Sequence, residues 1–168
     1  MEIRLLQQSD IKKIVEAFKV SNWTVKKYSL FEQYLNEQNQ SQRVCWTAYQ
    51  NEEFAGYVTL KWKSSYPHFS KREIPEIVDL NVLPLFRNKG VATALLDIAE
   101  ALVSSKTNTI GIGVGLYKDY GSAQRLYIKR GYLPDGQGVT YNYQPTTPGK
   151  SYCLDDDFIL WFTKKLNA

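Results

Sequence analysis

Apolar and polar positions follow two periods along this chain, and stretches of the two kinds are interleaved from one end to the other. Runs with the alternation or the β-branched content of strands occupy residues 1–6, 43–50, 54–62, 76–82, 109–116, 139–143 and 158–164. Runs in which apolar residues recur at helical spacing occupy residues 9–18, 30–37, 90–103 and 122–132. Residues 64–75 follow neither period and are predicted to form a loop. This mixture predicts an α/β fold with a mixed sheet.

Local signals mark several of the boundaries. Ser9 or Asp10 is placed to cap the first helix. A turn at residues 51–53 joins two strands as a hairpin. Gly131 ends the last predicted helix, because glycine accepts the left-handed conformation that often follows a helix. No internal repeat or Pro/Gly/Ser-rich linker divides the chain, so we expect one domain.

The stretch LFRNKGVATALL, residues 85–96, places two basic residues and a glycine between an apolar strand and a helix. The start of a helix offers unpaired N–H groups and about half a positive charge, which Arg87 and Lys89 would reinforce. Gly90 lets the backbone approach a ligand without a Cβ in the way, and Ala92 keeps the first turn slim. The turn suits a phosphate or pyrophosphate. The alternative is a solvated helix start with incidental basic residues.

Two better-known phosphate motifs are absent from the sequence. The P-loop needs a lysine after its second glycine, whereas Lys89 precedes Gly90. The dinucleotide motif needs a third glycine where this chain has Leu116. The alternating glycines of residues 111–115 instead describe a strand with one bare face. That face either packs tightly against a helix or leaves room for a ligand beside the backbone.

The motif R-x-x-G-x-A after a strand, with A-x-x-L-Y-x-K-x-G-Y further along, resembles the GNAT superfamily of acetyl-CoA-dependent N-acetyltransferases. The matching residues are Arg87, Gly90, Ala92, Ala123, Leu126, Tyr127, Lys129, Gly131 and Tyr132. The order of predicted elements fits this superfamily from end to end, so residues 1–168 are expected to form a single N-acetyltransferase domain. The resemblance implies a mixed, mostly antiparallel sheet, splayed between its fourth and fifth strands and flanked by helices.

The resemblance implies that acetyl-CoA is the acetyl donor and that no metal takes part. Backbone amides of the turn would hold the pyrophosphate of acetyl-CoA. These amides belong to Arg87, Asn88, Lys89, Gly90, Val91, Ala92 and Thr93. The pantothenate amides would pair with the backbone near Val82, as an added strand. Many members carry an asparagine where this chain has Tyr120, so a side-chain contact to the cofactor is altered or missing there.

The resemblance also implies catalytic roles. The amide of Leu80 would face the acetyl carbonyl and stabilise its oxyanion. Tyr127 would be the general acid that protonates the departing CoA thiolate, although its helical face alone describes a core aromatic residue. An acceptor amine with a pKa of about 10.4 must lose a proton, and Glu76 and Asp79 are the candidate bases, directly or through water. Strand alternation puts them on opposite faces unless a bulge intervenes, and either could be a solvated carboxylate at a strand end.

Aromatic and acidic residues near the first helices and the last strands suit a cationic acceptor amine. They are Trp23, Tyr28, Phe31, Tyr141, Tyr143, Tyr152 and the acidic run at residues 155–157. The alternative is ordinary packing and a solvated turn, because aromatic residues make up 14% of the whole chain.

Composition narrows the class of protein. The 168 residues are 43% hydrophobic and 23% charged, which is typical of a globular domain. The net charge is +4, but the basic residues are scattered, so they support nucleic-acid binding only weakly. No apolar run approaches the roughly 20 residues that span a bilayer, and the N-terminal residues do not resemble a secretory signal. We therefore expect a cytoplasmic monomer or homodimer with neither a nucleic-acid nor a membrane partner.

The expected function is direct transfer of the acetyl group from acetyl-CoA to a primary amine of a small molecule or peptide. The alternative is a non-catalytic acyl-CoA-binding regulatory module, which would keep the turn but lack a working base.

Overall fold

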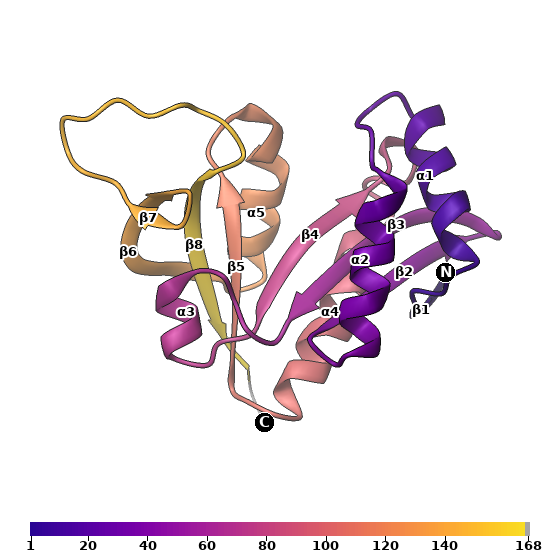
Figure 1. Cartoon of the computed structure of the whole chain (residues 1–168), viewed down its shortest axis with the longest axis horizontal. Helices are drawn as coiled ribbons and strands as arrows, with labels where there is room; N and C mark the ends of the chain where they lie inside the picture. The colour runs from indigo at the N-terminus through magenta and orange to yellow at the C-terminus, as the bar shows by residue number, and fades with distance from the viewer. Residues whose placement is uncertain (167–168) are drawn as a thin grey trace. The chain divides into compact units, whose positions relative to one another are not determined.

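The computed structural model describes residues 1–166 (Figure 1). In chain order its elements are β1 (Glu2–Leu5), α1 (Asp10–Val20), α2 (Tyr28–Asn39), β2 (Arg43–Gln50), β3 (Glu53–Lys61), α3 (Pro67–Lys71), β4 (Glu76–Val82), η1 (Pro84–Phe86), α4 (Val91–Ser104), β5 (Thr109–Gly115), η2 (Lys118–Tyr120), α5 (Gly121–Lys129), β6 (Leu133–Tyr141), β7 (Gln144–Pro145) and β8 (Phe158–Lys165). The predicted α/β class is confirmed, and the strand pairs within it are mostly antiparallel. No helix among the described residues is long and apolar enough to cross a membrane.

The described residues fall into two compact units. The first consists of Met1–Trp62 with Ile77–Ala101, and the second of Lys63–Glu76 with the described residues from Leu102 onward. Each unit is thus assembled from two separate segments of the chain.

The first unit is built on strands in the order β1-β2-β3-β4. β2 and β3 form the predicted hairpin, in which Gln50 lies opposite Glu53. Helices α1 and α2 lie next to each other (Figure 1). Phe18 of α1 and Phe31 of α2 are fully buried, with their rings 6.0 and 5.1 Å from the ring of Tyr57 on β3. These rings form the aromatic part of a core that also contains aliphatic side chains such as Leu60 and Leu95.

The cap predicted for α1 is different in the structure. The Ser9 side chain makes no capping hydrogen bond. Asp10 is buried instead, and it accepts hydrogen bonds from the Arg4 guanidinium at 2.7 and 2.5 Å. It also accepts the backbone N–H of Gln7 at 2.9 Å. The carboxylate ties the helix start to β1 rather than capping the helix.

The second unit contains strands in the order β5-β8-β6-β7. Its core includes Tyr66, Phe69, Ile74 and Trp161, and the rings of Tyr66 and Trp161 stack at 4.2 Å. The prediction of a loop over residues 64–75 is wrong in part, because α3 lies within it. A helix of five residues is too short to show a helical period.

Two further strand predictions are corrected in the second unit. β6 begins at Leu133, earlier than predicted, and ends at Tyr141, so residues 142–143 form a turn rather than the end of a strand. The bare glycine face of β5 is covered by aromatic rings. A Cβ would overlap Phe69 at Gly111, Trp161 at Gly113 and Tyr120 at Gly115. These glycines are therefore explained by tight packing and not by room for a ligand. The predicted packing against a helix applies only at Gly111, because Phe69 alone among the three aromatic residues belongs to an α-helix.

Candidate functional site

The turn predicted to bind phosphate joins β4 to α4 in the first unit. Asn88 and Gly90 in this turn are left-handed, with φ of 58° and 81°. The first described bond of α4 runs from the Ala94 N–H to the Gly90 carbonyl, at 3.0 Å. The amides of residues 91–93 therefore have no acceptor within their helix, which leaves a row of N–H donors at its start.

Gly90 is the residue of the turn that tolerates least change. Its φ of 81° is a conformation that L side chains rarely adopt. No heavy atom lies within 4 Å of the position that a Cβ would take. The backbone of the turn is thus open on this side, and Arg87, Asn88 and Lys89 are exposed around it.

Arg87 is already engaged within the first unit. Its guanidinium carbon lies 4.3 Å from the ring centre of Trp23, and its Nε donates to the Val82 carbonyl at 3.2 Å. Lys89 lies over Phe86, with its Nζ 5.6 Å from the ring centre. A cofactor amide that pairs with the Val82 carbonyl must therefore share it with the guanidinium or displace it.

Asp79 occupies the centre of a polar network in the first unit. Its carboxylate accepts hydrogen bonds from the hydroxyls of Tyr57 at 2.5 Å and Tyr34 at 2.8 Å. The Lys26 ammonium lies 3.0 Å away, and Asn81 Nδ2 donates at 2.7 Å. Burial opposes ionisation of Asp79, but Lys26 and the two tyrosine hydroxyls outweigh it and hold its pKa below the usual value. Asp79 is therefore a fixed negative charge.

The backbone of Asp79 is left-handed as well, with φ of 56° inside β4. Such a residue breaks the alternation of a strand, as in a bulge. On β3, a Cβ at Gly56 would overlap the Asn81 carbonyl and come within 3.1 Å of the Val82 Cα. Because Gly56 has no side chain, β3 can approach the irregular part of β4 closely. In the sequence, the only sign of this close approach is a glycine inside a strand pattern.

Glu76 lies in the second unit and is only 6% exposed. It accepts a hydrogen bond from Ser64 Oγ at 2.6 Å, and the same Oγ accepts the backbone N–H of Tyr66 at 2.9 Å. Neither Glu76 nor Asp79 is a solvated carboxylate at a strand end, which was the alternative interpretation of both.

Tyr127 and Tyr120 also belong to the second unit. Tyr127 of α5 is buried, and its hydroxyl makes no hydrogen bond with residues 1–166. Burial raises the pKa of Tyr127, so its hydroxyl stays protonated and available as a donor. Tyr120 donates to Asp156 at 2.8 Å, and its ring covers Gly115. The Tyr120 side chain thus holds the acidic run at residues 155–157.

The aromatic and acidic residues predicted to form an acceptor site have separate environments. Phe31 is a core residue, so its assignment to a pocket is wrong. Trp23 lies under Arg87. In the second unit, Tyr141 donates to Asp155 at 3.0 Å, and Tyr152 stacks on Phe158.

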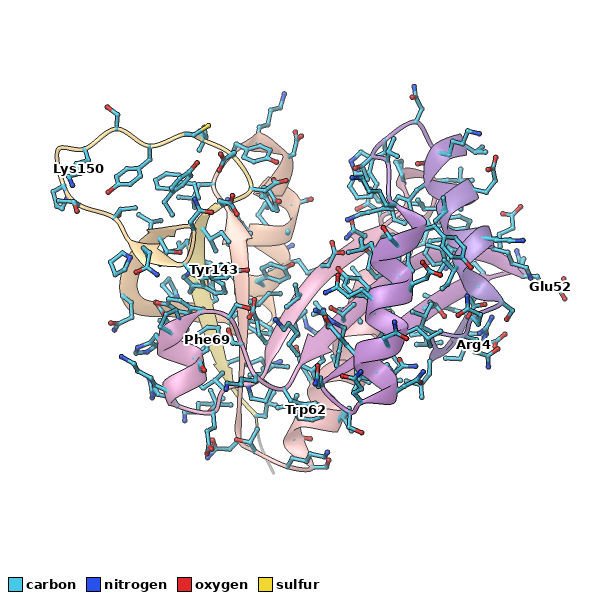
Figure 2. The ribbon with its side chains drawn as sticks, in the orientation of Figure 1. Arg4, Glu52, Trp62, Phe69, Tyr143 and Lys150 are labelled. Atoms are coloured by element: carbon cyan, nitrogen blue, oxygen red, sulfur yellow. The ribbon has the colours of Figure 1, made fainter. Side chains whose placement is uncertain are left out.

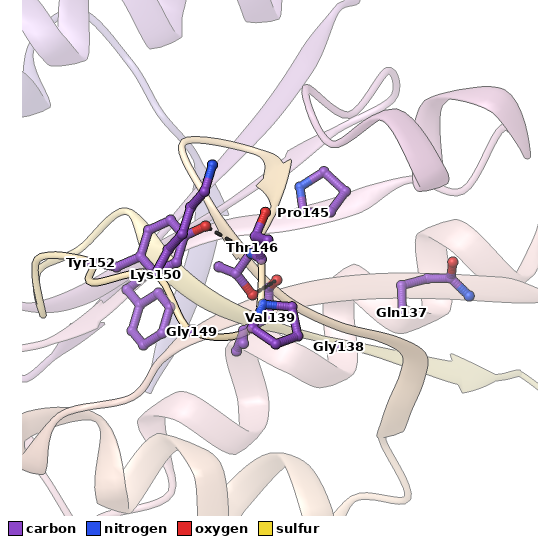
Figure 3. Close-up of a pocket in the computed structure, with 11 residues that line it drawn as sticks. Gln137, Gly138, Val139, Pro145, Thr146, Gly149, Lys150 and Tyr152 are labelled. Atoms are coloured by element: carbon purple, nitrogen blue, oxygen red, sulfur yellow. Dashed lines mark hydrogen bonds between the residues drawn. The ribbon is translucent and has the colours of Figure 1, made fainter.

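A pocket of about 390 Å³ lies among β6, β7 and the segment that follows (Figure 3). Tyr152 and Phe158 line it, and the Tyr152 hydroxyl accepts the Thr147 N–H at 2.7 Å. Lys150 is its only charged lining residue among those described. Among residues 1–166, no carboxylate that could pair with a cationic amine lines this pocket. Nor is a group of three or more His, Cys, Asp or Glu side chains placed to hold a metal ion within residues 1–166.

A family model described as the acetyltransferase (GNAT) family matches residues 9–132, which include segments of both units. The chain belongs to this family. The predicted family is thereby confirmed. The motifs R-x-x-G-x-A and A-x-x-L-Y-x-K-x-G-Y both lie inside the matched residues.

Solved structures of the GNAT fold resemble the chain over nearly its full length. An N-acetyltransferase from Staphylococcus aureus Mu50 is 15% identical, covers 99% of this chain and 98% of its own, and has a TM-score of 0.72. The ribosomal-protein-S18-alanine N-acetyltransferase from Escherichia coli is also 15% identical, with coverages of 99% and 94% and a TM-score of 0.69. A spermidine N-acetyltransferase from Vibrio cholerae is 16% identical, with coverages of 98% and 95% and a TM-score of 0.67. These matches show the fold, and no curated protein matches the sequence.

Proposed function

We propose that this acetyltransferase moves the acetyl group of acetyl-CoA directly to a primary amine of a small molecule or peptide. The observation that carries the proposal is the turn of residues 87–93. It combines helix N–H groups without helical acceptors, a left-handed glycine with open space beside it, and two exposed basic residues. Such a turn fits a pyrophosphate.

The irregular part of β4 supports the catalytic half of the proposal. The left-handed Asp79 immediately precedes Leu80, and its side chain is fixed by Tyr57, Tyr34 and Lys26. A preorganised N–H at Leu80 would stabilise the negative charge that develops on the acetyl oxygen in the transition state. Removal of one such donor in other enzymes costs about 3–4 kcal/mol of that stabilisation.

Of the two candidate bases, we assign the role to Glu76. Asp79 has its pKa lowered and its oxygens already occupied by an ammonium and two hydroxyls, so it accepts a proton poorly. Glu76 would take the proton of the acceptor ammonium, directly or through one water. The amine nitrogen would then attack the acetyl carbon as the bond to sulfur breaks.

Tyr127 would protonate the departing thiolate. Its raised pKa keeps the hydroxyl protonated at neutral pH, and the hydroxyl has no competing acceptor among residues 1–166. A phenylalanine at this position should therefore preserve acetyl-CoA binding and lower turnover.

The names of structural neighbours support an amine acceptor without selecting one. They include enzymes that acetylate spermidine, a ribosomal-protein alanine and an aminoglycoside.

The test compares Gly90→Ala with Gly136→Ala, measured by calorimetry with acetyl-CoA. Both glycines have a φ of 81° and no heavy atom within 4 Å of the position that a Cβ would take, so both variants suffer a similar backbone strain. Only Gly90→Ala should lose affinity, by at least about tenfold, because only its methyl group enters the proposed phosphate turn. Equal affinities in the two variants, or no acetyl-CoA binding by the wild type, would refute the assignment of the turn.

The alternative is a non-catalytic acyl-CoA-binding module. It predicts the same acetyl-CoA affinities in the calorimetry but no acetyl transfer. Release of free CoA thiol in the presence of a panel of primary amines distinguishes the two functions. An enzyme releases thiol with at least one amine, and the Tyr127→Phe variant releases it more slowly.

A further inference from the structure

The Arg87 side chain connects the proposed phosphate turn to two other parts of the first unit. Its Nε donates to the Val82 carbonyl of β4 at 3.2 Å, and its guanidinium carbon lies 4.3 Å from the ring centre of Trp23. Trp23 belongs to the connection between α1 and α2, and Figure 2 shows side chains between this connection and the end of β4. We call this placement of the guanidinium, between the ring and the carbonyl, the closed position of Arg87.

The ring of Trp23 is a fixed surface for the guanidinium. Its centre lies 6.1 Å from that of Phe18, which is fully buried in α1. Three residues further along the connection, the Lys26 ammonium lies 3.0 Å from Asp79 on β4. The connection is therefore held to the sheet independently of Arg87. A cation over such a ring gains electrostatic attraction, so the closed position is favoured by two contacts rather than one.

The closed position occupies the backbone group with which an acyl donor is expected to pair. An amide of the pantetheine arm would use the Val82 carbonyl as its acceptor. The Arg87 guanidinium already donates to this carbonyl, so the amide must share the oxygen or displace the guanidinium. A displaced guanidinium loses a hydrogen bond and the contact with the ring, and it needs a new partner.

A diphosphate supplies that partner. Arg87 is exposed and lies three residues before Gly90, in the turn whose open backbone is proposed to hold the pyrophosphate. A guanidinium binds phosphate oxygens through hydrogen bonds between opposite charges, which are stronger than its bond to a neutral carbonyl. CoA can therefore compensate the loss of the closed position, whereas a pantetheine compound without phosphate cannot.

We propose that Arg87, held by Trp23, is a specificity-determining residue that restricts the donor to thioesters carrying the diphosphate of CoA. In its closed position it withholds the Val82 carbonyl from pantetheine compounds that lack phosphate. Trp23 is a positioning residue, because it acts through Arg87. The inference deepens the proposed function and rests on it, since it concerns the same turn and the same acyl donor.

The experiment measures affinity by calorimetry for two probes, acetyl-CoA and pantetheine, of which the second has the amides but no phosphate. Both are titrated into the wild type, Arg87→Met and Trp23→Ala. Lys89→Met is the matched control, because it removes a positive charge from the same turn. The Lys89 ammonium lies 5.6 Å from the ring centre of Phe86, and it makes no hydrogen bond with residues 1–166.

The inference predicts that pantetheine binds Arg87→Met and Trp23→Ala at least about threefold more tightly than it binds the wild type, because the closed position no longer competes. Lys89→Met should bind pantetheine as the wild type does. In Arg87→Met the affinity for acetyl-CoA relative to pantetheine should fall by at least about tenfold, because the diphosphate loses its guanidinium. Trp23→Ala should keep the wild-type ratio, since its Arg87 still reaches the diphosphate.

An arginine that only binds phosphate gives a different result. Its loss would weaken acetyl-CoA and leave pantetheine unchanged, which would overturn the inference. Pantetheine that binds none of the four proteins, or that gains as much in Lys89→Met, would overturn it too. If thermal melting shows that Trp23→Ala is unfolded, Arg87→Met decides alone. Failure of the proposed function is distinguishable, because acetyl-CoA would then not bind the wild type, or would bind Gly90→Ala and Gly136→Ala equally.

Discussion

Glu76 and Asp79 lie on the same strand, but their surroundings differ in kind. Asp79 is surrounded by groups that compensate a negative charge, namely the Lys26 ammonium and the hydroxyls of Tyr57 and Tyr34. Glu76 is only 6% exposed, and its carboxylate accepts a hydrogen bond from Ser64 Oγ at 2.6 Å.

The difference indicates that Asp79 is a structural anchor, whereas Glu76 is the candidate for the chemical role of a base. A carboxylate bound to an ammonium has a lowered pKa, so it holds its neighbours well and accepts protons poorly. Asp79 therefore fits the task of fixing the left-handed backbone of β4 before Leu80. Glu76 is the proposed base, so the two residues should respond differently to loss of charge.

The largest effect is expected at Glu76. Glu76→Gln keeps the shape of the side chain but cannot accept a proton, and general-base catalysis is worth about 100-fold or more. We expect kcat to fall by roughly that factor, with acetyl-CoA binding unchanged. The deficit should narrow at higher pH, because more of the acceptor amine is then already neutral.

Asp79→Asn is the comparison for this variant. It should lose stability while it retains most of its turnover. A larger loss of kcat in Asp79→Asn than in Glu76→Gln would reverse the assignment of base and anchor.

The next effect in size concerns the ion pair of Lys26. Lys26→Met removes the ammonium that lies 3.0 Å from Asp79 and 5.8 Å from the centre of the Tyr57 ring. It leaves the carboxylate buried without its counter-charge, at a cost of about 2 kcal/mol in the free energy of unfolding. Thermal melting should fall by roughly 4–8 °C. Lys27→Met is the control, because Lys27 is exposed and makes no ion pair within residues 1–166.

The pH dependence gives this prediction a second readout. The pKa of Asp79 is lowered in the folded protein, so its charge stabilises the fold above the unfolded pKa of about 3.9. That stability is lost as the pH falls through the folded pKa. The difference between Lys26→Met and the wild type should therefore be largest at neutral pH and should shrink in acid. A difference that stays constant with pH would mean that Lys26 acts by packing alone.

Local patterns in the sequence predict the strand and the turn but not the network. β4 matches its prediction residue for residue, because Pro75 and Pro84 flank a short stretch rich in β-branched and other apolar residues. The turn that is proposed to bind phosphate can be predicted for a similar reason, since Gly90 directly precedes a periodic helix. In contrast, Tyr34 and Lys26 lie 45 and 53 residues from Asp79 in the chain. No short-range pattern can show that they meet.

The contacts among the rings of Tyr66, Trp161 and Tyr143 could not be predicted from the sequence for a related reason. Tyr66 lies in a segment predicted to be a loop, and α3 begins immediately after it. Trp161 belongs to a strand far along the chain, and Tyr143 was assigned to a strand although it is a turn residue. Their meeting depends on the pairing of β6 with β8. Pairing between strands is set by the whole sheet rather than by either strand alone.

The smallest predicted effect tests whether the left-handed turns themselves matter. Glu52→Gly should stabilise the protein by about 0.5–1 kcal/mol, because glycine accepts the φ of 68° without strain. Melting should rise by a few degrees, with kcat and both KM values unchanged. Tyr143→Gly relieves the same geometry but also removes a ring whose centre lies 6.0 Å from that of Trp161, so it should gain less stability than Glu52→Gly. A lower melting temperature for Glu52→Gly would contradict the assignment of strain to this turn.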